Sequence, residues 1–154
     1  VDCTPGFTAQ ELRGQQLFEA NGKVPCTSCH KPFSGTNIWF ANNGIDDVVT
    51  DPGAHAAALQ RDGNLGAFRA PSLRNVARTA PYMHDGRFAT LREVIDHYDH
   101  GIKASDNLDD FLHDGGIPRR MDLAEEDKDA LEAFLRTFTD EEMMADPKFS
   151  DPFP

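Results

Sequence analysis

Cys26, Cys29 and His30 lie within one five-residue stretch, Cys26-Thr27-Ser28-Cys29-His30, whose residue types and spacing can attach a haem of the c type. Two thiols separated by two residues can add to the two vinyl groups of one porphyrin. A histidine directly after the second cysteine then lies under the iron as its proximal ligand. The C-x-x-C-H pattern occurs once, so the sequence predicts one covalent haem c per chain.

Two other kinds of site use a C-x-x-C pair. A zinc site needs a second pair of ligands, and a thioredoxin-like redox pair needs a βαβ context. The sequence shows neither, which favours haem attachment. The remaining cysteine, Cys3, has three open interpretations: a free thiol, a bond between two chains, or the ragged start of a processed precursor.

Length and charge narrow the class of protein. A chain of 154 residues suits one domain, which we take as residues 1–154. The formal net charge of −11 argues against nucleic acid as a partner, because phosphate binding needs basic patches. No apolar run reaches membrane-spanning length and no signal peptide is evident. Since bacteria attach haem c outside the cytoplasm, we expect a mature, soluble protein that is periplasmic or otherwise exported.

Three helices are predicted from capping signals and apolar periodicity. Residues 8–11 form a capping box, and the helix that follows is expected to end at Asn21-Gly22. A second capping box at residues 90–93 starts a helix that Gly101 ends. A third helix is predicted over residues 123–138.

The second helix carries an inward-facing tyrosine. Tyr98 continues the apolar stripe at the i, i+3, i+4, i+7 spacing, whereas His97 is out of phase with it and is predicted to lie on the surface with His100. Glycine, proline and asparagine dominate residues 31–80, where we expect loops with short helical turns and no strand. The predicted fold class is mostly α, a cytochrome-c-like single domain with long loops around one covalent haem.

Residues 68–91, which include the motif Pro81-Tyr82-Met83-His84-Asp85-Gly86, closely resemble the C-terminal haem domain of the bacterial dihaem cytochrome c peroxidase and MauG family. Leu17-Phe18, Asn43-Gly44 and residues 133–137 resemble that family too. The similar region runs from about residue 11 to 140 and leaves residues 141–154 as a tail. Members of the family have two haem domains, and this chain resembles only the second. The haem that reacts with peroxide lies in the other domain.

The resemblance implies a sixth iron ligand fourteen residues beyond the motif histidine. That ligand is methionine in the peroxidases and tyrosine in MauG, and counting from His84 gives Tyr98. Met83 is the rival ligand, because single-haem cytochromes place an axial methionine in a comparable loop. Tyr98 could also be only a core aromatic with a local hydrogen bond. A phenolate ligand would favour ferric iron and lower the reduction potential, whereas a thioether would raise it.

Other residues receive roles by the same resemblance or by their chemistry. His84 is expected to line the haem surroundings as a hydrogen-bonding residue without binding iron. Arg74 and Arg78 are candidates to neutralise the haem propionates, because a guanidinium matches a carboxylate in a bidentate fork. Thr79 and Pro81 match positions whose backbone carbonyls help to hold a calcium ion in the family. That calcium site is incomplete without the N-terminal half.

The function implied is periplasmic redox chemistry of the cytochrome c peroxidase and MauG type, with peroxide as the oxidant. The expected partner is a small cytochrome, a cupredoxin or a second haem domain, and a homodimer is an open alternative. A stand-alone electron-transfer cytochrome without catalysis is the second hypothesis. A ligand sensor, in which Tyr98 leaves the iron, is the third. No catalytic residue is assigned, because the sequence offers no recognisable acid-base pair for cleaving a peroxide.

Overall fold

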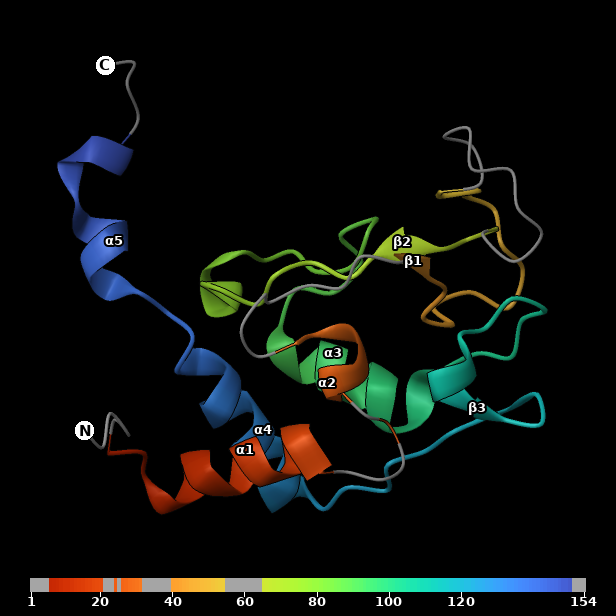
Figure 1. Ribbon diagram of the computed structural model, residues 1–154, viewed down its shortest axis with the longest axis horizontal. Helices are drawn as coiled ribbons and strands as arrows, with labels where there is room; N and C mark the ends of the chain where they lie inside the picture. The colour runs from red at the N-terminus through yellow and green to blue at the C-terminus, as the bar shows by residue number, and fades with distance from the viewer. Residues whose placement is uncertain (1–5, 21–23, 25, 32–39, 55–64, 151–154) are drawn as a thin grey trace.

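The computed structural model describes residues 6–20, 24, 26–31, 40–54 and 65–150 (Figure 1). The α-helices are α1 (Ala9–Ala20), α2 (Cys26–Cys29), α3 (Leu91–Asp96), α4 (Glu125–Arg136) and α5 (Glu141–Ala145). The single turns are η1 (Val76–Arg78), η2 (His97–Gly101), η3 (Asp110–Leu112) and η4 (Pro147–Phe149). None of the helices is both long and apolar enough to cross a membrane, as far as the described residues go. The predicted mostly helical class agrees with this architecture.

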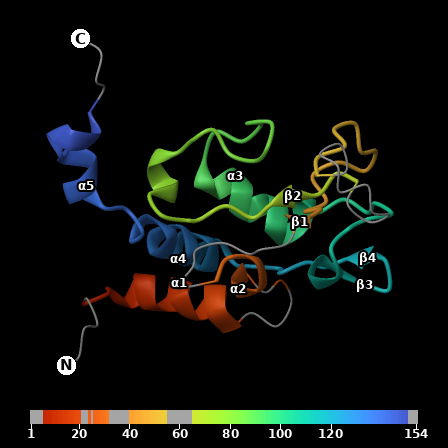
Figure 2. The ribbon, with the colours of Figure 1, turned by 45° about the horizontal axis from the view of Figure 1, so that its top comes forward.

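Helices α1 and α4 lie side by side along one side of the molecule (Figures 1 and 2). Gly14 of α1 faces the backbone of Ala130 in α4, and a Cβ atom on it would overlap the Ala130 carbonyl and lie 2.7 Å from Cβ of Phe134. The missing side chain therefore lets the two helices approach closely. This close packing brings the start of the chain onto its last long helix.

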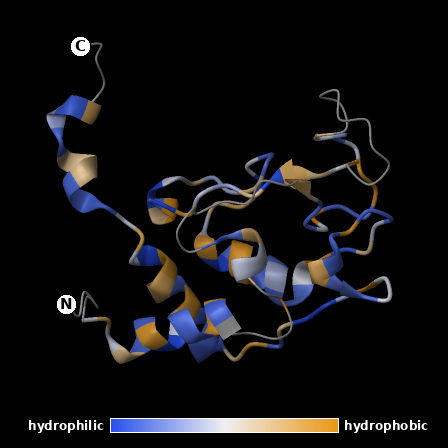
Figure 3. Cartoon of the chain, in the orientation of Figure 1, coloured by the Kyte–Doolittle hydropathy of each residue, from blue (hydrophilic) through white to orange (hydrophobic). Residues whose placement is uncertain are grey.

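A first apolar cluster joins three helices. Its buried members come from α1, α3 and α4: Phe18, Leu91, Ile95, Leu131, Phe134 and Leu135. The rings of Phe18 and Phe134 lie 5.5 Å apart, and Cys26 packs against the cluster from α2. Figure 3 shows both hydrophobic and hydrophilic colours along α4, because only one face of the helix meets this core.

A second apolar cluster is formed mainly by residues that follow η2 in the chain, together with Val24. It consists of the buried residues Val24, Ile102, Leu108, Leu112 and Met121. Tyr98 packs against this cluster from η2. Both clusters therefore anchor the segment that carries the two cysteines. Val24, just before α2, is buried in the second cluster, and Cys26 of α2 packs against the first.

Both predicted capping boxes are present. The Glu11 carboxylate accepts hydrogen bonds from the backbone N–H and the hydroxyl of Thr8, while the backbone N–H of Glu11 donates to Thr8 Oγ1 at 3.2 Å. Thr90 and Glu93 form the same reciprocal pair at the start of α3. The predicted end of the first helix, Asn21-Gly22, lies outside the described residues.

The prediction that residues 31–80 contain no strand is wrong. Strand β1 (Phe40–Ala41) pairs antiparallel with β2 (Phe68–Arg69), far along the chain. A second pair follows η3, with β3 (His113–Asp114) joined to β4 (Ile117–Pro118) by a hairpin. Strands of two residues are too short to show an alternating pattern, so the sequence gives no sign of them.

The prediction of a surface His97 is also wrong. Regular α3 ends at Asp96, and the chain continues as a π-helical turn, η2, up to Gly101. A π-turn inserts one extra residue and so rotates the following side chains relative to an α-helix. His97 is only 5% exposed, whereas His100 is exposed as predicted.

Candidate haem site

Helix α2 presents the two cysteines of the C-x-x-C-H pattern on one turn. Neither Cys26 nor Cys29 forms a disulfide with another described residue, and both are half-buried. The backbone N–H of His30 donates to the Cys26 carbonyl at 2.9 Å, so the helical hydrogen bonding extends to the histidine. The local fold therefore holds two thiols and one imidazole as a compact donor set.

The His30 ring has a fixed tautomer. Its Nδ1 lies 3.0 Å from the carbonyl oxygen of Pro71, and a carbonyl can only accept, so Nδ1 carries the proton and Nε2 carries the lone pair. Burial lowers the pKa of His30, and the hydrogen bond to Pro71 only partly offsets this effect. His30 is therefore a neutral imidazole with Nε2 free to bind a metal, which is the state that an iron ligand needs.

The thiols do not suit the two alternative chemistries of a C-x-x-C pair. Burial raises the pKa of Cys29 to about 11, and the nearby Asp109 carboxylate adds to the rise, whereas a redox-active pair needs a lowered thiol pKa. Among the described residues, Asp96, Asp99 and His100 are the only group of three or more His, Cys, Asp or Glu side chains close enough to share a metal ion. That group includes neither cysteine, which argues against zinc there.

Tyr98 meets the C-x-x-C-H turn in space. Burial raises the pKa of its phenol to about 12, and the neighbouring thiols of Cys29 and Cys26 raise it further, while a side-chain hydrogen bond with Asn43 lowers it. Tyr98 and the two cysteines are therefore close enough to interact electrostatically, although they are distant in sequence; the role of Tyr98 as the sixth ligand stays a prediction. The π-turn that carries Tyr98 is one of the features that position it.

Met83, the rival ligand, lies in the same neighbourhood. It adopts a left-handed backbone conformation with φ of 72°, and its Sδ accepts a hydrogen bond from Asn43 Nδ2 at 3.4 Å. The backbone carbonyl of Asn43 is itself 3.0 Å from Nε2 of the buried His97. Asn43 therefore contacts Met83 and the histidine that directly precedes Tyr98, although the sequence gave it no role beyond the family resemblance.

His84 is exposed and stacks on the ring of Phe68, with ring centroids 3.9 Å apart and planes inclined by 12°. Both residues line a cavity of about 10 Å³, which is room for about one water molecule. Its expected place in the haem surroundings stays a prediction.

A larger cavity lies beside His30. It measures about 220 Å³, and its walls include the aromatic rings of Phe7, Phe18, Phe134 and Phe138. Arg74 also lines it, which places one of the two arginines predicted for the propionates on the same wall as the histidine.

Arg78 instead forms an ion pair with Glu141, 2.6 Å apart, in which both side chains are largely exposed. Thr79 and Pro81, the residues predicted for calcium, are exposed in the loop that follows. Their role as carbonyl donors stays a prediction.

The donor set fits a covalent haem. It combines two thiols on one turn, a neutral imidazole whose Nε2 carries the lone pair, a buried phenol that interacts electrostatically with the thiols, and an apolar cavity at the imidazole. Each part agrees with what haem c attachment and axial ligation require.

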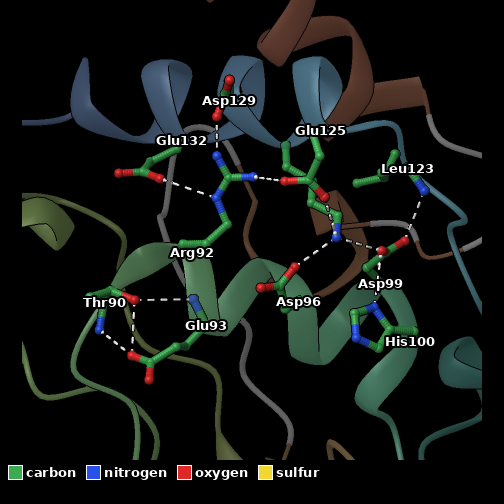
Figure 4. Close-up of polar contacts among 11 residues, drawn as sticks. Thr90, Arg92, Glu93, Asp96, Asp99, His100, Leu123, Glu125, Asp129 and Glu132 are labelled. Atoms are coloured by element: carbon green, nitrogen blue, oxygen red, sulfur yellow. Dashed lines mark hydrogen bonds and ion pairs between the residues drawn. The ribbon is translucent and has the colours of Figure 1, made fainter.

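An ion cluster around the buried Lys128 joins α4 to the end of α3 and to η2 (Figure 4), the turn that also carries Tyr98. The ammonium of Lys128, whose residue is 6% exposed, lies 2.7 Å from Asp96, 3.1 Å from Asp99 and 3.2 Å from Glu125. Asp99 also accepts the backbone N–H of Leu123 at 2.9 Å. Burial alone would raise the pKa of Asp99, but the hydrogen bonds from Leu123, His100 and Lys128 outweigh burial and hold it below its usual value.

A mostly helical fold built around a C-x-x-C-H turn, with a buried phenol beside it, is the arrangement expected of a c-type haem domain. No family model matches the chain. The chain is similar to the cytochrome-c peroxidase IdrP1 of Pseudomonas sp. (strain SCT), with 29% identity over 92% of this chain and 42% of that protein. It is also similar to the methylamine utilization protein MauG of Methylorubrum extorquens, with 30% identity over 84% of this chain and 34% of MauG.

The fold resembles a MauG-like protein associated with microbial copper homeostasis, with a TM-score of 0.79 and 34% identity over 97% of this chain and 49% of that one. Over most of its length the chain is related to the cytochrome c peroxidase and MauG family of dihaem peroxidases, as the sequence predicted. It spans less than half the length of these relatives.

Proposed function

We propose that this chain is a haem c domain of a cytochrome c peroxidase or MauG-type oxidoreductase, and that it relays electrons in a peroxide-linked reaction. Cys26 and Cys29 attach the haem, and the iron ligands are Nε2 of His30 and the phenolic oxygen of Tyr98. The observation that carries the proposal is the His30 imidazole directly after the two half-buried thiols, with its Nδ1 held 3.0 Å from the Pro71 carbonyl and an apolar cavity of about 220 Å³ beside the ring.

The haem supplies one-electron chemistry, and the protein residues set its orientation and potential. The Pro71 carbonyl holds the Nδ1 proton of His30 and thereby aims Nε2 at the metal position. The Tyr98 phenol is neutral in the free chain and would hold the iron through its oxygen as the anion. An anionic oxygen donor favours ferric iron, so a low reduction potential is expected.

The relatives support the oxidoreductase class, since they are peroxidases and MauG proteins. Because the chain spans less than half of them, the haem that meets peroxide is expected on a second domain or a separate partner. A small cytochrome or cupredoxin is the alternative partner. We place the protein in the periplasm, where haem c is attached. In the same proposal Arg74 and Arg78 serve the propionates, His84 lines the haem surroundings, and a calcium ion at Thr79 and Pro81 requires the second domain.

A stand-alone electron carrier is the second candidate. The single C-x-x-C-H motif in this chain favours it, because one haem with two protein ligands transfers electrons without binding a substrate. This carrier predicts that peroxide leaves the optical spectrum of the holoprotein unchanged in the presence of the second haem domain of a relative.

The test compares ferric and ferrous optical spectra of the holoprotein for the wild type, Tyr98→Phe and Met83→Leu. Tyrosine ligation predicts no methionine-to-iron charge-transfer band in the wild type, a changed spin state in Tyr98→Phe and an unchanged spectrum in Met83→Leu. A methionine band that Met83→Leu abolishes, together with a silent Tyr98→Phe, would overturn the ligand assignment.

A further inference from the structure

The C-terminal arm, residues 140–150, projects away from α1 and α4 and contains α5 and η4 (Figures 1 and 2). Its large apolar side chains face solvent: Met143 is 43% exposed, Met144 52% and Phe149 64%. Within the part of the chain that the structure describes, α5 and η4 add no member to either apolar cluster. Large apolar side chains that gather on an exposed segment are typical of an interaction surface.

The arm is ordered by its own side chains. The Asp140 carboxylate accepts the backbone N–H of Met143 at 2.8 Å, and the Asp146 carboxylate accepts that of Lys148 at 2.9 Å. Turns as short as α5 and η4 are marginal in water without such support. An arm that is already ordered loses less conformational entropy when it binds a partner.

The base of the arm is attached to η1 and the residue before it. The backbone N–H of Asp140 donates to Asn75 Oδ1 at 2.7 Å, and the backbone N–H of Asn75 donates to the Phe138 carbonyl at 2.9 Å. Arg78 of η1 pairs with Glu141 at 2.6 Å. These contacts fix the point at which the arm leaves the haem domain, so the apolar side chains are presented in one place.

The structural relative indicates which kind of partner covers the arm. The match to the MauG-like protein covers 97% of this chain, so the matched region includes the arm. It covers only 49% of the MauG-like protein. Members of this family carry two haems, whereas this chain has one C-x-x-C-H motif. The arm therefore has its counterpart in a longer chain, and the unmatched half of that chain is the source of a second haem domain.

Charge argues against a second copy of this chain as the partner. The arm is acidic, with Asp140, Glu141, Glu142 and Asp146 against Lys148, and the whole chain has a formal net charge of −11. Two acidic copies repel each other. An apolar surface with cationic side chains around it complements the arm.

We propose that the C-terminal arm binds a second haem domain, in which Met143, Met144 and Phe149 enter an apolar surface bordered by cationic side chains. The inference rests on the proposed function, which expects that domain. It goes further, because it names the surface of this chain that binds it.

The test places this chain in a hybrid protein, where it replaces the matched half of the MauG-like protein and both halves carry haem. We expect the amides of the arm to exchange hydrogen at least tenfold more slowly in the hybrid than in the haem-loaded chain alone. Phe149→Asp should abolish most of this difference. Val48→Asp, at a residue that is 70% exposed in another loop, is the matched control and should leave it unchanged.

Equal exchange in the hybrid and in the chain alone would overturn the inference, as would a difference that Phe149→Asp leaves intact. If the hybrid does not fold, calorimetry measures binding of the haem-loaded chain to the separately produced, haem-loaded other half. No binding there, or equal affinities of the wild type and Phe149→Asp, would overturn it too.

Sedimentation of the haem-loaded chain tests the second copy. We expect a monomer, and a dimer that Phe149→Asp dissociates would assign the arm to a copy of this chain and refute the second haem domain as its partner. Optical spectra separate this inference from the proposed function. The proposed ligation fails if Tyr98→Phe is silent, whereas an arm without protection in a protein whose spectrum Tyr98→Phe does change refutes only the role of the arm.

Discussion

At the residue scale, Lys128 is a buried cation that pairs with Asp96 and with the buried Asp99. Replacing it by Met leaves the carboxylates of Asp96 and Asp99 without their cation, and Asp99 is 4% exposed. Removing one partner of a buried ion pair costs roughly 3 kcal/mol of the free energy of unfolding. We expect a loss of that size for Lys128→Met in denaturant titrations of the holoprotein, with a changed spectrum because η2 loosens.

Arg136→Met is the matched control for Lys128→Met. Arg136 pairs with Glu132 on the surface of α4, and its side chain is 61% exposed, so the variant should lose no more than about 0.5 kcal/mol. Equal losses in the two variants would show that solvent screens the Lys128 cluster as well.

A second residue-scale prediction concerns acid. Arg13 donates two hydrogen bonds to Asp127, at 2.8 and 2.9 Å, and these bonds lower the pKa of Asp127. A carboxyl with a lowered pKa in the folded state stabilises the protein above its unfolded pKa of about 4, and this contribution disappears as the pH falls through the folded value. Asp127→Asn should therefore cost up to about 1 kcal/mol at neutral pH, and this cost should vanish once the pH has fallen below the lowered pKa of folded Asp127.

Unfolding curves at several pH values check this expectation. Asp106→Asn, at an exposed loop residue, serves as the control and should show no such convergence with the wild type. A stability difference for Asp127→Asn that persists at pH 2 would assign it to something other than the ion pair.

The residues of the candidate site were predictable from sequence only where they form a motif of neighbouring residues. Cys26, Cys29 and His30 form a local motif, so spacing alone identified them. Tyr98 required the family resemblance, since an inward aromatic on a helix is more often only core. Pro71 contacts His30 and Asn43 contacts Met83, and no local pattern encodes such contacts between residues distant in sequence.

At the scale of elements, the crossing of α1 and α4 depends on Gly14. Alanine would gain about 1 kcal/mol in helix propensity, but its Cβ would overlap the Ala130 carbonyl, and overpacking costs typically 1–3 kcal/mol or more when backbone must move. We expect Gly14→Ala to lower the free energy of unfolding by about 2 kcal/mol. Gly6→Ala, with nothing within 4 Å of the added Cβ, is the control and should not destabilise. Equal stability of Gly14→Ala and the wild type would mean that the helices separate without loss.

The two capping boxes correctly predicted the starts of α1 and α3, because a cap depends only on side chains within one helical turn. The π-turn was not predicted, and so the burial of His97 was not predicted either. One inserted residue rotates the side chains around the helix axis and leaves no sign in the composition. Strands β1 to β4 escaped for a different reason: each has two residues and is stabilised by a partner elsewhere in the fold or by a hairpin.

At the scale of the whole molecule, helical periodicity and the haem motif predicted the fold class, whereas the loops between residues 40 and 80 needed the structure. Glycine and proline residues indicate where the chain turns, but they do not indicate which distant segment it then packs against. The pairing of β1 with β2 decides the path of this segment and brings Phe68 to His84. Chain topology was the part of the fold that local patterns could not supply.

The net charge of −11 predicts how the whole molecule meets small redox reagents. An acidic protein attracts cations and repels anions, and salt weakens both effects, because the Debye length falls from about 30 Å at 0.01 M to about 10 Å at 0.1 M ionic strength. Oxidation of the reduced holoprotein by hexaammineruthenium(III) should therefore slow as salt is added, and oxidation by ferricyanide should accelerate. Stopped-flow rates across this range measure both trends. If salt changes both oxidation rates in the same direction, the electrostatic field at the haem edge does not follow the net charge. A local basic surface would then determine the choice of partner.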